Sequence, residues 1–195
     1  MYGEKIEEIL LNLEDSKIHL AGGSAVGGVL SVVNALIKYI ANLSLGKKKY
    51  ENVQDKIEEI LKEAEELKQK SIRAIDEDKE ILEKILNAYK IRKENEKQYQ
   101  EVLKEAVTFC MEVVSIAYDT LILSDRISKV GNKMLESDFK ICKYYAIASV
   151  QSAIENVKVN VKEIENIEYK LSVEKKCNEI LEEGGNMLDK KTNIF

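Results

Sequence analysis

At 195 residues the chain is long enough to bury a hydrophobic core without disulfides, and a single domain over residues 1–195 is its simplest organisation. Charged residues make up 33% of it, and it contains no proline and no tryptophan, which is typical of an all-α protein. The net charge of −5 argues against a general nucleic-acid-binding protein, because such proteins present a basic surface.

Sulfur and imidazole groups are too few and too scattered for a metal site. The chain has one histidine, His19, and three cysteines without Cys-x-x-Cys spacing: Cys110, Cys142 and Cys177. This set predicts no metal and no disulfide framework, and it favours a reducing, cytoplasmic setting.

No segment is expected to target or cross a membrane. The N-terminus lacks the basic start and apolar stretch of a signal peptide. The most apolar run, residues 25–45, is interrupted by Asn34, Lys38 and Asn42, so we predict no membrane-spanning helix.

Hydrophobic residues at helical spacing predict an antiparallel bundle of about six to seven helices, with one long central helix. In chain order the expected helices cover residues 3–15, 23–45, 50–89, 95–123, 124–131, 137 or 138 to about 161–163, and 165–183. Gly46 is expected to stop the second helix, and Gly184 with Gly185 to stop the last one before a polar tail.

Four glycines at the start of the second predicted helix need a physical reason, because each interior glycine costs roughly 1 kcal/mol relative to alanine. They are Gly22, Gly23, Gly27 and Gly28. Steps of four residues put Gly23, Gly27, Ser31 and Ala35 on one stripe of small residues. Close packing by another helix explains this pattern, and so does a ligand that reaches the backbone amides.

The long third helix is predicted to carry an inward apolar seam. The seam contains Ile57, Ile60, Ala64, Leu67, Ala74, Ile81, Ile85 and Ala88. Only Ser71 and Asp78 interrupt it, and a carboxylate removed from water is costly unless it is paired, hydrogen-bonded or protonated. Asp78 is therefore either a structural acid, paired to a lysine or to a helix N-terminus, or a group for acid–base chemistry.

A third unusual stretch covers residues 130–161. Spacings of three and four residues place a polar set on one helical face, namely Asp138, Cys142, Tyr145, Ser149, Ser152 and Asn156. Such a face suits a cleft better than a dry core.

Together these stretches resemble the cyclodeaminase/cyclohydrolase family, the domain that follows formiminotransferase in bifunctional folate enzymes and also occurs alone as methenyltetrahydrofolate cyclohydrolase. The matching segments, in family order, are Leu20–Ser24, Ile40–Tyr50 with its Gly-Lys-Lys-Lys-Tyr end, Asp76–Asp78, Val130–Asn132 with Ser137–Asp138, and Asn156–Asn160. The resemblance implies an all-helical homodimer that binds a tetrahydrofolate derivative as substrate beside the glycine-rich segment. It implies no metal and no other cofactor.

The same resemblance suggests roles for individual residues. Asp78 is the expected acid–base group, with Asp76 and Asp138 as neighbours that set its proton affinity. The expected substrate-binding residues are Gly22, Gly23, Ser24, Asn42, Lys47, Lys48 and Asn132. Two of these assignments have structural alternatives, because lysines are favourable just beyond a helix C-terminus and Asn132 can cap a helix.

Some positions depart from the family pattern. Leu20 and Ala21 replace its Pro-Gly, Lys133 and Met134 replace its Pro-Asn, and residues 139–142 are bulkier than usual. We expect a formimidoyltetrahydrofolate cyclodeaminase, with methenyltetrahydrofolate cyclohydrolase as the alternative. A helical folate-binding or assembly protein that has lost catalysis is the further alternative that these departures favour.

Overall fold

The computed structural model describes residues 2–189, and within them it is helical without strands. The elements are α1 (Tyr2–Glu14), α2 (Gly22–Asn42), the 3-10 helix η1 (Lys48–Val53), α3 (Gln54–Lys90), α4 (Glu96–Val130), the 3-10 helix η2 (Lys133–Leu135), α5 (Glu136–Lys162) and α6 (Ile167–Asp189). The predicted all-α class and the long third helix are confirmed.

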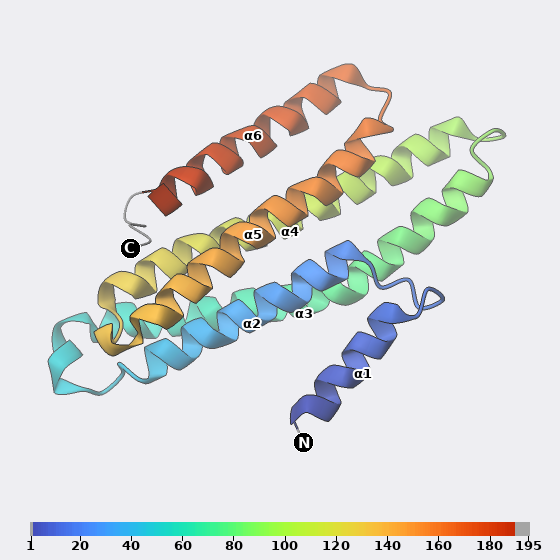
Figure 1. The fold of residues 1–195 in the computed structure, drawn as a ribbon. Helices are drawn as coiled ribbons and strands as arrows, with labels where there is room; N and C mark the ends of the chain where they lie inside the picture. The colour runs from blue at the N-terminus through green and yellow to red at the C-terminus, as the bar shows by residue number, and fades with distance from the viewer. Residues whose placement is uncertain (1, 190–195) are drawn as a thin grey trace.

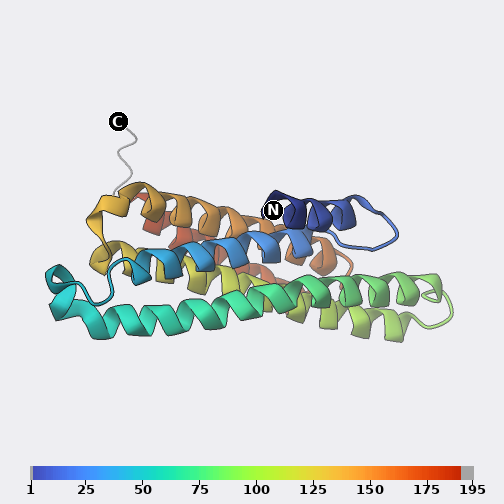
Figure 2. The same ribbon diagram turned by 90° about the horizontal axis from the view of Figure 1, so that it is seen from below.

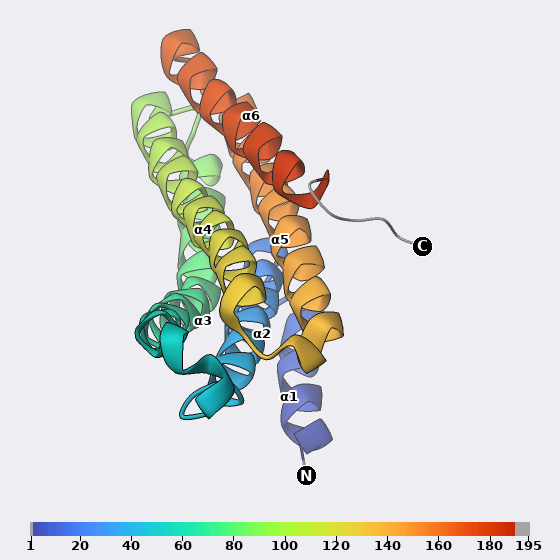
Figure 3. The same ribbon diagram turned by 90° about the vertical axis from the view of Figure 1, so that its left-hand side faces the viewer.

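Helices α2 to α5 form an antiparallel four-helix bundle, and α6 packs on α5 and α4 (Figure 1). Short connections over residues 91–95, 131–135 and 163–166 turn the chain back on itself, which makes consecutive helices antiparallel neighbours. Seen from below, α2 lies between α3 and α5 (Figure 2). Helix α1 is splayed away from α2 and makes only marginal contact with the other elements (Figures 1 and 3).

The core confirms the predicted seam of α3. Its first four turns bury Ile57, Ile60, Ala64 and Leu67 against the inner face of α2. Each such side chain contributes about 1.5–3 kcal/mol when it is fully buried, so this seam anchors the whole of α3. Further along, Ser71 is fully buried and Asp78 is half-buried, as the pattern predicted for the two polar interruptions.

Three predicted helix boundaries are wrong. Helix α4 runs unbroken through Ser124, because the buried Ser124 hydroxyl donates a 2.8 Å hydrogen bond to the Thr120 carbonyl instead of capping a new helix. Helix α2 ends at Asn42, and Gly46 comes four residues later with a left-handed φ of 68°. Helix α6 continues through Gly184 and Gly185 to Asp189, and the predicted polar tail beyond it lies outside the described residues.

Two helices, α2 and α4, are long and apolar enough to cross a membrane by those criteria alone. Their most apolar windows are 50% and 56% buried inside the bundle, which is also what core helices show. Half of the residues in the apolar window of α2 are therefore buried by packing within this chain. Among the remaining residues, Val29, Val32 and Tyr39 are exposed.

Candidate active site

The N-terminus of α2 is capped from another helix. Its own N-cap residue, Ala21, has no side chain that can accept a hydrogen bond. Instead Asp78 on α3 accepts 2.8 Å and 2.9 Å hydrogen bonds at Oδ2 from the backbone amide and hydroxyl of Ser24. A carboxylate is favoured at this position, because the first amides of a helix lack partners and carry its positive end. The structural alternative, pairing with a helix N-terminus, is thus realised.

Gly23 allows this close approach. A Cβ atom built on Gly23 would lie 2.0 Å from Asp78 Oδ1 and 2.5 Å from its Cγ, so no larger residue fits without moving the carboxylate. Oδ1 itself has no hydrogen-bond partner among the described residues, and it is not one of the fully buried unpaired atoms. Asp78 therefore has one oxygen fixed by α2 and one oxygen available to a further group.

Polar groups of α4 and α5 border the same helix end. The Asn156 side chain lies beside Gly22, where a Cβ atom would be 3.4 Å from Asn156 Oδ1. Asn160, one turn later, donates from Nδ2 to the Asn156 carbonyl at 3.0 Å and to Cys110 Sγ at 3.6 Å. We call the set Gly22, Gly23, Ser24, Asp78 and Asn156 the glycine end. It combines bare backbone, a carboxylate and an amide.

The other two predicted acids do not join Asp78. Asp76 is exposed, since a position two residues away on a helix points to a different side. Asp138 lies in the first turn of α5, and Asn156 comes 18 positions later, about 27 Å along that helix. Within one chain, therefore, neither Asp76 nor Asp138 lies against the Asp78 carboxylate as predicted.

The remaining predicted binding residues gather at the opposite end of α2. Asn42, Lys47 and Lys48 are exposed there, and Asn132 and Asp138 are half-buried. We call these five residues the lysine end. The 21 residues of α2 separate it from the glycine end by about 30 Å, so one chain cannot bring both ends to one small ligand.

A polar lock connects two loops at the lysine end. The buried Ser44 hydroxyl accepts a 2.8 Å hydrogen bond from the Asn132 amide and donates to the Ile40 carbonyl. Tyr50 Oη donates to Asn132 Oδ1 at 3.1 Å, and that oxygen also accepts from the Met134 amide and caps η2. The Asn132 side-chain oxygen is thus engaged in structure, which realises the capping alternative.

We predict that Ser44→Ala lowers the free energy of unfolding by about 1–3 kcal/mol, because it strands the Asn132 amide without its acceptor. The matched control is Ser172→Ala, which removes an exposed hydroxyl that also bonds only to backbone, and it should change the value by less than about 0.5 kcal/mol. Urea unfolding followed by circular dichroism measures both. Equal values for the two variants would contradict the lock.

The departures from the family pattern pack away from the glycine end. Phe139 and Cys142 are buried in the core with Tyr50 and Ile127. Met134 is 87% exposed, and the Lys133 ammonium donates to the Ser128 carbonyl at 2.7 Å near the end of α4. The bulk of Phe139 and Cys142 therefore fills the bundle, and none of these side chains contacts Asp78 in the described hydrogen bonds.

The loop before α2 tolerates Leu20 and Ala21 in place of the Pro-Gly of the family pattern. Ala21 has an extended backbone with φ of −129°, which any residue adopts. The left-handed position falls on His19 with φ of 61°. His19 Nδ1 is buried without a hydrogen bond and lies 3.7 Å from the Glu83 carboxylate of α3. No role for His19 is predicted from the sequence, because an isolated histidine in a loop carries no spacing signal.

Asn160 and Cys110 also received no site role from the sequence. The Asn156–Asn160 spacing of four residues was the available signal, since it places both amides on one helical face. Cys110 had no such signal, because its position depends on how α4 packs against α5.

Cys110 is not a nucleophile in this setting. Burial raises the pKa of its thiol to about 12, with a smaller contribution from the negative charge of Asp78. Burial likewise raises the pKa of Cys142 to about 12.

We predict that a thiol reagent such as dithionitrobenzoate at pH 8 modifies Cys110 and Cys142 slowly in the folded protein and rapidly in urea, because the thiolate is the reacting form. Rapid modification before unfolding would contradict the buried placement.

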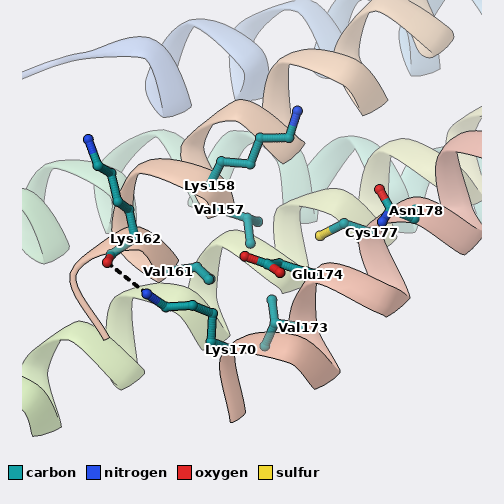
Figure 4. Close-up of a pocket in the computed structure, with 9 residues that line it drawn as sticks. All are labelled: Val157, Lys158, Val161, Lys162, Lys170, Val173, Glu174, Cys177 and Asn178. Carbon is teal, nitrogen blue, oxygen red and sulfur yellow. Dashed lines mark hydrogen bonds between the residues drawn. The ribbon is translucent and has the colours of Figure 1, made fainter. Parts of the chain in front are cut away.

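Two surface hollows lie away from the glycine end. One, of about 360 Å³ between α5 and α6, has an apolar floor that includes Val157 and Val161 (Figure 4). On its rim the Lys170 ammonium donates to the Lys162 carbonyl at 2.9 Å. The other hollow, of about 500 Å³ between α3 and α4, is lined by several glutamates, with Glu77 beside Asp78 in sequence. Neither is lined by residues 22–24.

The fold and the site place the protein in a class of antiparallel all-α bundles in which a carboxylate from one helix caps the glycine-rich start of another. The sequence profile of one family, described as formiminotransferase-cyclodeaminase, matches residues 5–179. The chain therefore belongs to the formiminotransferase-cyclodeaminase family.

Two individual proteins show the same relationship. A methenyltetrahydrofolate cyclohydrolase of Methylorubrum extorquens is 27% identical over 189 residues, which cover 93% of this chain and 91% of that protein. The crystal structure of a formiminotetrahydrofolate cyclodeaminase from Thermotoga maritima superimposes with a TM-score of 0.82 at 30% identity, covering 94% of this chain and 89% of the other.

Proposed function

We propose that the protein is a folate one-carbon enzyme, a formimidoyltetrahydrofolate cyclodeaminase that works by general acid–base catalysis. The observation that carries the proposal is the carboxylate of Asp78, with Oδ2 fixed by Ser24 and Oδ1 available beside Gly23. Membership of the family and the likeness to a solved cyclodeaminase support the choice of substrate.

The proposed reaction needs one group that takes a proton and returns it. N10 of the substrate attacks the carbon of the protonated formimino group, and the new N10–C bond forms as Asp78 Oδ1 accepts the N10 proton. The same proton then passes to the amino nitrogen, whose bond to carbon breaks, so ammonia leaves and the methenyl ring remains. A positioned carboxylate typically contributes about 10²–10⁴-fold to such a step.

Other groups of the glycine end bind and orient the substrate in this proposal. The amides of Gly22 and Gly23 point out of the start of α2 and can donate to a carbonyl or anionic group of the pterin. Asn156 offers donors and an acceptor beside them. Asn42 at the pterin edge, with Lys47 and Lys48 on the glutamate tail, belongs to the lysine end about 30 Å away along α2, so these residues can reach the same substrate only from the other subunit of the proposed homodimer. The enzyme is proposed to act as a soluble cytoplasmic homodimer without metal or other cofactor.

The second candidate is methenyltetrahydrofolate cyclohydrolase, which the curated relative of that name favours. Here water adds to the methenyl carbon and gives one proton to Asp78; the carbon–N5 bond then breaks as N5 takes that proton, and the hydroxyl proton is released to solvent as the formyl C=O bond forms. The two reactions use the same carboxylate, so the geometry of Asp78 serves both. A folate-binding or assembly protein without catalysis is the third candidate.

Absorbance of the methenyl product separates the three candidates. Purified protein, with EDTA present, is given 5-formimino- and 5,10-methenyl-tetrahydrofolate in separate reactions. A cyclodeaminase makes the absorbance rise with the first substrate, and a cyclohydrolase makes it decay with the second. No rate above the uncatalysed one with either substrate would reject both enzymes.

A further inference from the structure

The hollow of about 360 Å³ between α5 and α6 lies outside the proposed catalytic site (Figure 4). Its floor consists of Val157 and Val161 of α5 with Val173 and Cys177 of α6, and these residues are only 1–8% exposed. Small-molecule sites in proteins have volumes of roughly 300–1,000 Å³ and apolar linings with a few polar groups. We call this cavity the α5–α6 hollow, and its size and floor fit a small molecule with an apolar part.

Two opposite charges that line the hollow do not pair with each other. Lys170 and Glu174 are four residues apart on α6, so their Cβ atoms are about 5–6 Å apart on one face of the helix. The same spacing at Lys175 and Glu179 of α6 gives an ion pair of 3.9 Å. The Lys170 ammonium instead donates to the Lys162 carbonyl of α5 at 2.9 Å, and Glu174 has no ion pair or hydrogen bond within residues 2–189. One cation and one anion are therefore held separately beside the apolar floor.

The other two lysines of the hollow are less suited to hold a ligand. The Lys158 ammonium lies 2.7 Å from the Glu155 carboxylate, and the side chains of Lys158 and Lys162 extend away from the floor (Figure 4). Lys170 is half-buried, its position is fixed by the bond to α5, and two of its three N–H donors remain available. The charged groups that a ligand on the floor would meet are thus the ammonium of Lys170 and the carboxylate of Glu174.

A zwitterion complements this pair of charges better than a simple ion. A simple anion would bring its charge beside the carboxylate of Glu174, and a simple cation would bring its charge beside the ammonium of Lys170, so either would meet a like charge. A free α-amino acid carries an ammonium and a carboxylate on one carbon, and can bridge two groups that are one helical turn apart. Its side chain must be apolar to cover the valines of the floor.

We infer that the α5–α6 hollow binds a free apolar α-amino acid such as leucine. The ligand ammonium donates to the Glu174 carboxylate, the ligand carboxylate accepts from the Lys170 ammonium, and the side chain lies on the apolar floor. The hollow is separate from the glycine end, because Asn156 meets Gly22 whereas the next residue, Val157, points about 100° away around α5 into the hollow. The inference therefore does not depend on the proposed folate reaction.

The ligand class is tested by isothermal titration calorimetry of the full chain with three matched probes. L-leucine carries both charges, 4-methylpentanoate lacks the ammonium, and 3-methylbutylamine lacks the carboxylate. Leucine is expected to bind at one site per chain, and each analogue is expected to bind about tenfold more weakly or worse, because it leaves one charged group without its hydrogen bond. No binding of leucine, or an analogue that binds as tightly as leucine, would overturn the inference.

Substitutions on α6 test whether the ligand lies in the hollow. Lys170→Gln and Glu174→Gln are each expected to weaken leucine binding about tenfold or more while circular dichroism stays helical. Glu174→Gln keeps the bond from Lys170 to α5, so it decides the question if Lys170→Gln does not fold. The matched controls are Lys175→Gln and Glu179→Gln, which change an exposed pair of the same spacing outside the hollow and should bind leucine like the parent chain. Leucine affinity that is unchanged in Glu174→Gln, or equally weakened in the controls, would overturn the placement in the hollow.

Discussion

Asp78→Asn is expected to fold like the parent chain and to lose about 10²–10⁴-fold in turnover. Asparagine can still accept from the Ser24 amide through its carbonyl oxygen, so the cap of α2 survives. The group in place of Oδ1 becomes an amide nitrogen, which cannot take the proton from N10. The measurement is kcat from methenyl absorbance, together with a urea unfolding curve.

A matched pair separates catalysis from capping in that experiment. Asp78→Ala removes the cap as well as the carboxylate, so it should also lose about 0.5–2 kcal/mol of unfolding free energy. Ser24→Ala keeps the backbone donor and Asp78 itself, and should cost less than Asp78→Asn in turnover. Parent-like kcat in Asp78→Asn would remove Asp78 from the mechanism and leave it a purely structural acid.

The second large effect is expected at Gly23. In Gly23→Ala the new methyl would lie 2.0 Å from Asp78 Oδ1, so the carboxylate must leave its position and its bonds to Ser24. Overpacking of this kind typically costs about 1–3 kcal/mol in stability. We expect turnover to fall with it, because the proton acceptor is displaced. Unfolding curves and kcat on the same preparation give both values.

Neighbouring glycines supply the controls for Gly23→Ala. A Cβ atom at Gly28 meets nothing within 4 Å, so Gly28→Ala should raise stability by up to about 1 kcal/mol through helix propensity alone. At Gly27 the Cβ atom would lie 2.8 Å from the Ser71 carbonyl, so Gly27→Ala should lose stability without displacing Asp78. The same loss of turnover in all three variants would show that the effect is not specific to the carboxylate.

Much of the fold could be predicted from the spacing of hydrophobic residues, because helices that pack together bury residues at intervals of three and four positions. The inner seam of α3 is the best example, since its one carboxylate proved to be the residue that meets α2. The stripe of small residues on α2 was a less reliable guide to which residues pack against a neighbouring helix. Steps of four residues drift by about 40° each on a helix with 3.6 residues per turn. Gly23 and Gly27 therefore face α3, whereas Ala35 is exposed.

The site itself was only partly predictable. Motif order along the chain grouped Gly22 and Ser24 with Lys47 and Asn132 in one predicted site, but it carries no information about distance, and within one chain these residues lie at opposite ends of α2. Asp138 therefore joined Asp78 in the prediction, although antiparallel helices put them far apart. The bulk at Phe139 was expected to affect the site, and only packing reveals that it turns into the core.

The polar lock of Ser44, Asn132 and Tyr50 affects the entropic cost of binding an anion at the lysine end. Since Asn132 ties the segment after α2 to the end of α4, the backbone that carries Lys47 is held on both sides before any ligand arrives. Gln54 adds to this by accepting from the Gly46 amide at 2.7 Å. Little main-chain freedom remains to be lost on association, so the entropic penalty falls mainly on the lysine side chains. A negatively charged ligand tail would thus bind to lysine side chains that remain flexible on a backbone that is already rigid.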